Sequence, residues 1–170
     1  ISELPTPTRE NYIFKGWYVD CKCTTEVTLP YTLTEDTTLY AKWQPTYLVR
    51  FEINGGSNVD SFRDVEISKL PIPTRNYYNF EGWYFDEQCT IEFSLPYVLT
   101  EDIVLYAKWV PTYLVRFETN GGSKVESFRD VEISELPTPT RENYIFKGWH
   151  VDYKCTTEVT LPYTLTEDTT

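Results

Sequence analysis

The sequence predicts a mostly β protein that is built from tandem copies of one small module. The first observation is a repeat without gaps: Ile1-Ser2-Glu3-Leu4-Pro5 returns as Ile67-Ser68-Lys69-Leu70-Pro71 and as Ile133-Ser134-Glu135-Leu136-Pro137, 66 positions apart each time (67 − 1 and 133 − 67). A period of this size indicates an array of small domains. The second observation is that short alternating runs lie between turn signals, and no segment offers three clean helical turns.

The copies follow the order A, B, A. Residues 1–38 and 133–170 differ only at the pairs Tyr18/His150 and Cys21/Tyr153. The middle copy differs from both at many more positions. Near-identity of this kind gives little support to a catalytic role, and it favours length, avidity or surface display.

Two proline linkers define the natural unit, because each closes one run of strand residues and leads into another. They are Trp43-Gln44-Pro45-Thr46 and Trp109-Val110-Pro111-Thr112. We therefore expect residues 1–45 to be the C-terminal part of a repeat, 46–111 to be a complete repeat, and 112–170 to be a repeat that lacks its last strand. We also expect the polypeptide to continue beyond both ends, or neighbouring molecules to pack head to tail and supply the missing strands.

The first half of the complete repeat predicts a hairpin and a helical turn. Residues 47–53 alternate between apolar and polar side chains, as a half-buried strand requires. Asn54-Gly55-Gly56 follows, and Asn-Gly supplies the positive φ angles of a tight turn. The return strand is expected over residues 59–65 with a bulge. Residues 66–70 are compatible with one helical turn that ends at the following prolines.

The second half predicts three more strands, over residues 80–84, 90–93 and 104–109. Gly82 interrupts the first of them, where a bulge or a close backbone approach is expected. Aromatic side chains are abundant throughout the repeat, and they are compatible with a core or with a platform that stacks on sugars. The core interpretation is favoured, and its central members are expected to be Tyr47, Val49, Phe51, Phe80 and Trp109.

Composition restricts the classes of partner. The formal net charge is −11, and Lys and Arg are scattered along the chain. Binding to nucleic acid or to anionic membranes needs clustered positive charge, so neither is expected. No apolar run approaches the ~20 residues of a membrane span, so membrane insertion is not expected either.

The cysteines do not fit a disulfide framework. Cys23, Cys89 and Cys155 occupy the same position in successive copies, and such positions lie too far apart to be bridged. Cys21 is additional, and a bridge to Cys23 would close a very tight ring. We expect four unpaired, partly buried thiols and no metal site, because the chain has a single histidine. No cofactor-binding motif is present.

Four motifs in a fixed order resemble the Listeria–Bacteroides repeat, which is also called the B repeat of internalin B. In the complete copy these motifs are Asn54-Gly55-Gly56, Pro71-Ile72-Pro73-Thr74, Tyr78-Asn79-Phe80-Glu81-Gly82-Trp83 and Leu105-Tyr106-Ala107-Lys108-Trp109. The resemblance implies small β-grasp-like domains with little helix, in tandem arrays on secreted or wall-attached bacterial proteins that are often adhesins. It implies no catalytic residues, and the repeated cysteine is a departure from the family pattern.

Two functions remain open at this stage. The first is a non-enzymatic stalk or spacer of a bacterial cell-surface or secreted protein, which the repetition, the short proline joints and the acidity favour. The second is a module that binds a host or matrix protein or a glycan; its candidate contact residues are Tyr18, Tyr84 and His150, which follow the repeated tryptophan. An enzyme is disfavoured, and a covalent cross-link through Lys108 or Cys89 is a remote alternative.

Overall fold

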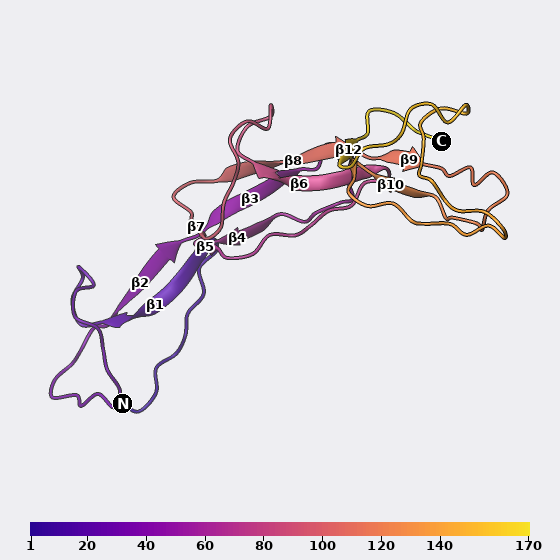
Figure 1. Cartoon of the computed structure of the whole chain (residues 1–170). Helices are drawn as coiled ribbons and strands as arrows, with labels where there is room; N and C mark the ends of the chain where they lie inside the picture. Colours follow the sequence, from indigo (N-terminus) through magenta and orange to yellow (C-terminus); the bar gives the residue numbers. More distant parts are fainter. The chain divides into compact units, whose positions relative to one another are not determined.

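The computed structural model describes residues 1–170, which form twelve strands joined by loops and no helix (Figure 1). The predicted mostly β tandem array is therefore confirmed. The chain divides into two compact units. One contains Ile1–Glu52, Val59–Pro71 and Trp83–Tyr106, and the other contains Ile53–Asn58, Ile72–Gly82 and Ala107–Thr170. Both units include parts of the middle copy, so the domain boundaries at 45/46 and 111/112 stay predictions.

The middle copy forms the largest sheet. Its strands are β3 (Tyr47–Glu52), β4 (Phe62–Asp64), β6 (Tyr78–Tyr84) and β8 (Ile103–Pro111). They follow the order β4-β3-β8-β6, in which β3 is antiparallel to β4 and parallel to β8. The first and last strands of the copy thus lie side by side in the centre of the sheet. This is the β-grasp strand order that the resemblance implies, built without a helix.

The opening hairpin has the predicted turn. Asn54 and Gly55 have φ angles of 46° and 85°, and the Gly56 amide donates a hydrogen bond of 2.9 Å to the Ile53 carbonyl. The return strand is shorter than expected, because the residues after the turn bond elsewhere. The Ser57 amide donates to the Thr74 carbonyl at 2.7 Å, which attaches the turn to the proline segment instead of to β3.

Two expected elements of the middle copy are wrong. Residues 66–70 form no helical turn; β5 (Glu66–Ile67) instead pairs with β7 (Tyr97–Val98). The reason is burial, since Ile67 is 1% exposed and this pairing places it in the core. Residues 90–93 form no strand but only an isolated bridge between Tyr84 and Glu92.

The first copy contributes a two-stranded sheet to the first unit. β1 (Tyr12–Tyr18) and β2 (Tyr40–Pro45) are antiparallel, and the register shifts between Phe14 and Gly16. Gly16 has a φ of 136°, and a Cβ atom there would lie 2.8 Å from a carboxylate oxygen of Glu26. A bulge with a close approach, as expected for the equivalent Gly82, is therefore present here.

The third copy, in the second unit, repeats the opening elements of the module. β9 (Tyr113–Val115) pairs with β10 (Phe128–Asp130), and β11 (Glu132–Ile133) pairs with β12 (Tyr163–Thr164). Its small core consists of Val115, Ile133 and Leu165, with Tyr113, Phe117, Phe128, Leu136 and Tyr163 packed against them.

The core of the middle copy is partly as predicted. Val49 is fully buried, together with Ile67 and Leu105. The other four predicted core residues are only half-buried: Tyr47, Phe51, Phe80 and Trp109. Three of them, Phe51, Phe80 and Trp109, pack against another aromatic ring. The ring centroids of Phe51 and Trp83 lie 4.6 Å apart, and those of Phe80 and Trp109 lie 5.4 Å apart.

Candidate functional site

The tryptophan of the Gly-Trp motif is used by the fold in all three copies. Each indole N–H donates to the carbonyl of the proline twelve residues earlier: Trp17 to Pro5 at 2.8 Å, Trp83 to Pro71 at 2.9 Å and Trp149 to Pro137 at 2.7 Å. The bond fastens the proline segment to the strand. The polar edge of each ring is therefore occupied inside the domain.

The Asn-Gly-Gly turn and the final strand hold each other. The Asn54 side-chain amide donates to the Ala107 carbonyl at 2.8 Å, and the Trp109 indole donates to the Ile53 carbonyl at 2.9 Å. Gly56 lies directly against the Trp109 ring, where a Cβ atom would overlap it. The motif thus needs glycine at position 56 for close approach to the tryptophan.

An arginine completes the same turn from the other side. The guanidinium carbon of Arg75 lies 3.8 Å from the centroid of the Tyr78 ring, and the group also lies against Gly55. The same stacking recurs in the other copies, between Arg9 and Tyr12 at 3.8 Å and between Arg141 and Tyr144 at 3.9 Å. This arginine therefore has a structural role in each of the three copies.

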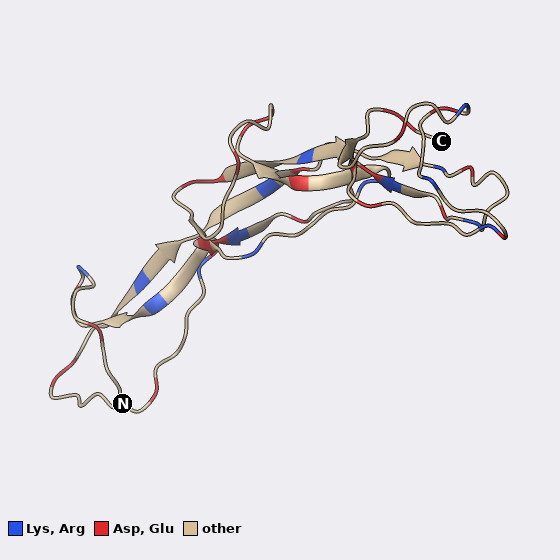
Figure 2. Cartoon of the chain, viewed as in Figure 1, with Lys and Arg blue, Asp and Glu red and all other residues tan.

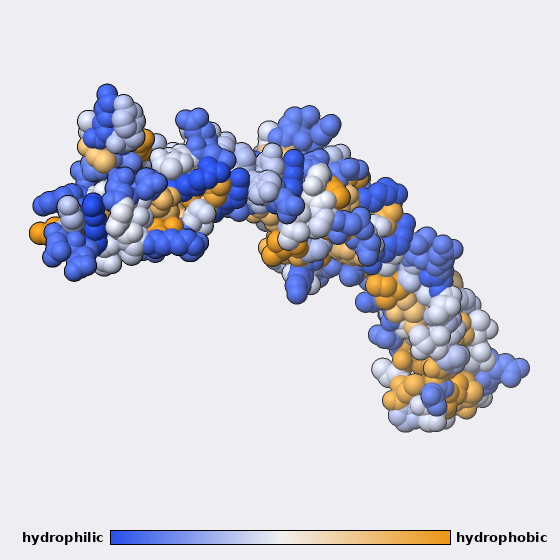
Figure 3. Space-filling model, turned by 90° about the vertical axis from the view of Figure 1, so that its right-hand side faces the viewer, coloured by the Kyte–Doolittle hydropathy of each residue, from blue (hydrophilic) through white to orange (hydrophobic).

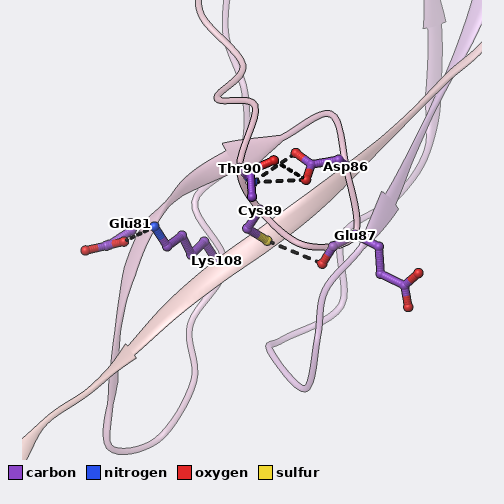
Figure 4. A network of polar contacts seen from close by, with 6 residues as sticks. All are labelled: Glu81, Asp86, Glu87, Cys89, Thr90 and Lys108. Carbon is purple, nitrogen blue, oxygen red and sulfur yellow. Dashed lines mark hydrogen bonds and ion pairs between the residues drawn. The ribbon is translucent and has the colours of Figure 1, made fainter.

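An aspartate organises the loop that follows β6. The Asp86 carboxylate accepts hydrogen bonds from the Thr90 amide at 3.0 Å and the Thr90 hydroxyl at 2.7 Å (Figure 4). It also accepts one from the Ile91 amide at 2.6 Å. Desolvation acts to raise the pKa of Asp86, but the hydrogen bonds from Ile91 and Thr90 outweigh it and hold the pKa below its ordinary value. An ionised acceptor of this kind is a structural cap and a poor proton donor.

The equivalent loops are built alike. Asp20 bonds to the amides of Lys22, Thr24 and Thr25, and its pKa is lowered, chiefly by the Thr25 amide. Asp152 bonds to the corresponding amides in the third copy, which outweigh its desolvation and also lower its pKa. The sequence analysis missed this role, although an Asp followed four residues later by Thr in every copy was the available signal.

The cysteines lie in these loops. Cys23, Cys89 and Cys155 have φ angles of 54°, 52° and 53°, a region that favours Gly and Asn. None of the four cysteines forms a disulfide. Cys21 and Cys155 are exposed, which corrects the expectation that all would be partly buried. Nothing in the structure explains why cysteine occupies this turn position. No group of three or more metal-ligating side chains occurs among the described residues.

The three predicted partner-binding residues differ in exposure. Tyr18 and Tyr84 are buried, each 8% exposed, and therefore offer little surface to a partner. His150 is half-buried and lines a groove in the third copy. Their role as contact residues stays a prediction.

A groove in the third copy is lined by residues from several of its segments, His150 among them. It has a volume of about 560 Å³, and its apolar walls include Phe117, Phe146 and Trp149. In the middle copy, Trp109 of β8 packs on Phe80, the counterpart of Phe146. The groove therefore lies at the position that Trp109 of the last strand occupies in the middle copy.

Charged side chains are dispersed and paired locally. Figure 2 shows Lys and Arg interspersed with Asp and Glu along strands and loops. Lys108, a candidate for covalent linkage, forms an ion pair of 3.1 Å with Glu81, and both side chains are about two-fifths exposed, at 40% and 44% (Figure 4). This ion pair has the exposure of a surface salt bridge.

Comparison with known proteins agrees with the repeat pattern. Residues 1–42, 47–108 and 113–170 each match the Listeria-Bacteroides repeat domain. The chain is 40% identical over 162 residues to a protein of Evansella cellulosilytica that is provisionally named a membrane protein, covering 89% of this chain and 24% of that protein. It is 28% identical over 109 residues to Internalin H of Listeria monocytogenes, covering 61% of this chain and 20% of that protein.

The chain thus spans about a quarter or less of the length of these relatives. No solved structure matches it. None of its segments is a helix of the length and hydrophobicity that crossing a membrane requires.

Proposed function

Because the chain belongs to the Listeria-Bacteroides repeat domain family, we propose that it is part of a non-enzymatic spacer in a bacterial cell-surface or secreted protein of the adhesin type. The array carries other domains away from their point of attachment. Its main partners are then the neighbouring copies of the same repeat, and nucleic acid and membrane insertion have no part in it.

One observation carries this proposal: the recurring side chains are used to build the module. The indole groups bond to backbone carbonyls, the glycines admit the tryptophan ring, and the aspartates accept backbone amides. The function of a protein depends on its sites. In this repeat the recurring polar groups bond within the module, so few of them are available for catalysis. Duplication of such a module changes length without changing reactivity.

The dispersed charge supports the same function. An excess of acidic residues in every copy disfavours association between neighbouring arrays, so an array remains extended and separate from others. The short proline joints limit the freedom between copies.

A direct binding test separates the spacer from a binding module. The purified 170-residue chain is assayed against immobilised glycans, extracellular-matrix proteins and host cells at micromolar concentration. The spacer function predicts no saturable binding to any of them. Saturable binding that surface substitutions abolish, in variants with the same number of copies, would overturn the spacer function.

A second candidate function, binding of a host or matrix protein or a glycan, is favoured by one observation. A leucine is exposed at the same position in every copy, with Leu29, Leu95 and Leu161 at 44%, 44% and 43% exposure. Figure 3 shows orange, apolar residues in separate groups among blue ones on the face in view. Separate groups of this kind are ordinary for a soluble surface, whereas repetition could give avidity to weak contacts.

The same assay distinguishes the two functions. If the array binds, Leu95→Ser should weaken binding, and serine at Leu29 and Leu161 as well should weaken it further with each copy that is altered. His150→Ala tests the predicted contact residue in the groove. If the wild-type chain shows no binding signal, the spacer function is retained and the binding function is rejected.

A further inference from the structure

Consecutive copies are joined by the same backbone contact. The threonine after the linker proline donates its amide proton to a turn carbonyl of the preceding copy. Thr46 donates to Asn11 at 2.9 Å, and Thr112 donates to Tyr77 at 2.7 Å. Asn11 and Tyr77 are equivalent positions, and both have a positive φ, 63° and 67°. This turn residue presents its carbonyl to the joint in both cases.

An arginine of the following copy holds the threonine from the other side. Arg63 donates to the Thr46 carbonyl at 2.8 Å, and Arg129 donates to the Thr112 carbonyl at 2.8 Å. Each joint is therefore a chain of three groups: the turn carbonyl, the threonine peptide and the guanidinium. The pattern links two copies through atoms that the repeat reproduces at every junction.

The side-chain contacts of the two joints differ. At the first joint, the Thr46 hydroxyl also donates to the Asn11 carbonyl, at 2.8 Å. At the second joint the guanidinium carbon of Arg129 lies 4.3 Å from the centroid of the Tyr77 ring. At the first joint the equivalent residue is Asn11, which has no ring. Thr112 is also buried, at 9% exposure, whereas Thr46 is half-buried. Arg129 thus contacts the preceding copy directly, in addition to the threonine carbonyl.

The backbone makes tyrosine an unexpected residue at this position. A φ of 67° is favoured by Gly and Asn and strained for a bulky side chain. The first and third copies carry Asn11 and Asn143 there, which suit the turn. A strained residue persists where another contact compensates for it, and the stacking of Tyr77 on Arg129 is that contact.

We propose that Tyr77 and Arg129 form a clasp between the second and third copies, so that this joint opens less often than the joint at Thr46. In an array of alternating copies, joints that follow a B copy would then be the firmer ones. The spacer role matters here only for what a firmer joint would do in the whole protein. The contact itself is testable without it.

Amide hydrogen exchange in the complete chain measures the opening of each joint. Thr46 and Thr112 share the local sequence Pro-Thr-Tyr, so their intrinsic exchange rates match. Thr112 is expected to exchange more slowly than Thr46. Tyr77→Asn, which installs the residue of the other copies, should speed Thr112 exchange about 2- to 5-fold, the effect of losing an exposed cation–π contact. Asn11→Tyr should slow Thr46 exchange.

Two controls separate the clasp from general stability. Tyr77→Phe keeps the ring and should leave Thr112 exchange unchanged. The Ser123 amide, which donates to Thr140 inside the third copy, should be unaffected by every variant. Since Tyr77→Asn also relieves backbone strain, the melting temperature should rise or stay constant while Thr112 exchange accelerates. Equal exchange of Thr112 in the wild type, Tyr77→Asn and Tyr77→Phe would overturn the proposal, whatever the function of the array.

Discussion

Replacing Trp109 by alanine should unfold the middle copy. The ring packs on Phe80 at 5.4 Å, lies against Gly56, and donates its indole proton to the Ile53 carbonyl. Truncation of a buried tryptophan costs about 3–5 kcal/mol, and the half-burial of Trp109 places it near 3 kcal/mol. That is comparable to the whole stability of a core of this size, which rarely exceeds about 3–5 kcal/mol.

Trp109→Phe provides the matched control, because it retains a ring on Phe80 and removes only the hydrogen bond to Ile53. It should cost about 1 kcal/mol, the typical net contribution of one hydrogen bond. The order of stability is then wild type, Trp109→Phe, Trp109→Ala.

Urea titration followed by NMR tests this order, because the indole N–H signal of Trp83 reports on the middle copy and that of Trp149 on the third. With a slope of about 1 kcal/mol per molar urea, the Trp83 midpoint should fall by about 1 M in Trp109→Phe, and the folded signal should be largely lost in Trp109→Ala. An unchanged Trp83 midpoint in Trp109→Ala would refute the claim that the last strand completes the core.

The remaining predictions concern acid stability, thiols and the groove. Since the pKa of Asp86 is lowered in the folded state, its stabilisation is complete above the ordinary value of 3.8 and is lost as the pH falls through the lowered pKa. Asp86→Asn should therefore flatten the fall in melting temperature below pH 3.8, and an identical acid profile would contradict this. Thiol titration of the denatured, unreduced chain should find four free thiols, and a smaller number would disprove unpaired cysteines. A peptide with the sequence of Ile103–Pro111 should bind the groove and change the fluorescence of Trp149, whereas its Trp109→Ala form should not; equal signals from both peptides would reject the match.

Alternation and turn chemistry predicted the sheet because both act locally. Residues 47–53 alternate cleanly, and β3 forms there. The Asn54-Gly55 turn has the positive φ angles that its residue types favour. The final strand was predicted at residues 104–109, within β8. In each case the side-chain pattern of a few residues specifies the backbone.

Elements that depend on distant contacts were not predictable in this way. β5 has two residues and hence no period, and its strand character comes from pairing with β7 across a long loop. Tyr18 and Tyr84 were expected at the surface, yet they are buried at the end of their strands. The joint between Tyr77 and Arg129 joins two copies, and no local pattern connects those positions.

The central claim, that the array is a spacer, is tested most directly by changing the number of copies. Chains that differ by one whole 66-residue unit, added at the boundary between Pro111 and Thr112, are compared by small-angle X-ray scattering. The spacer function predicts that the maximum dimension grows by a constant increment of about 30 Å for each added copy, as expected for compact units placed in series. A maximum dimension that stays constant as copies are added would contradict it.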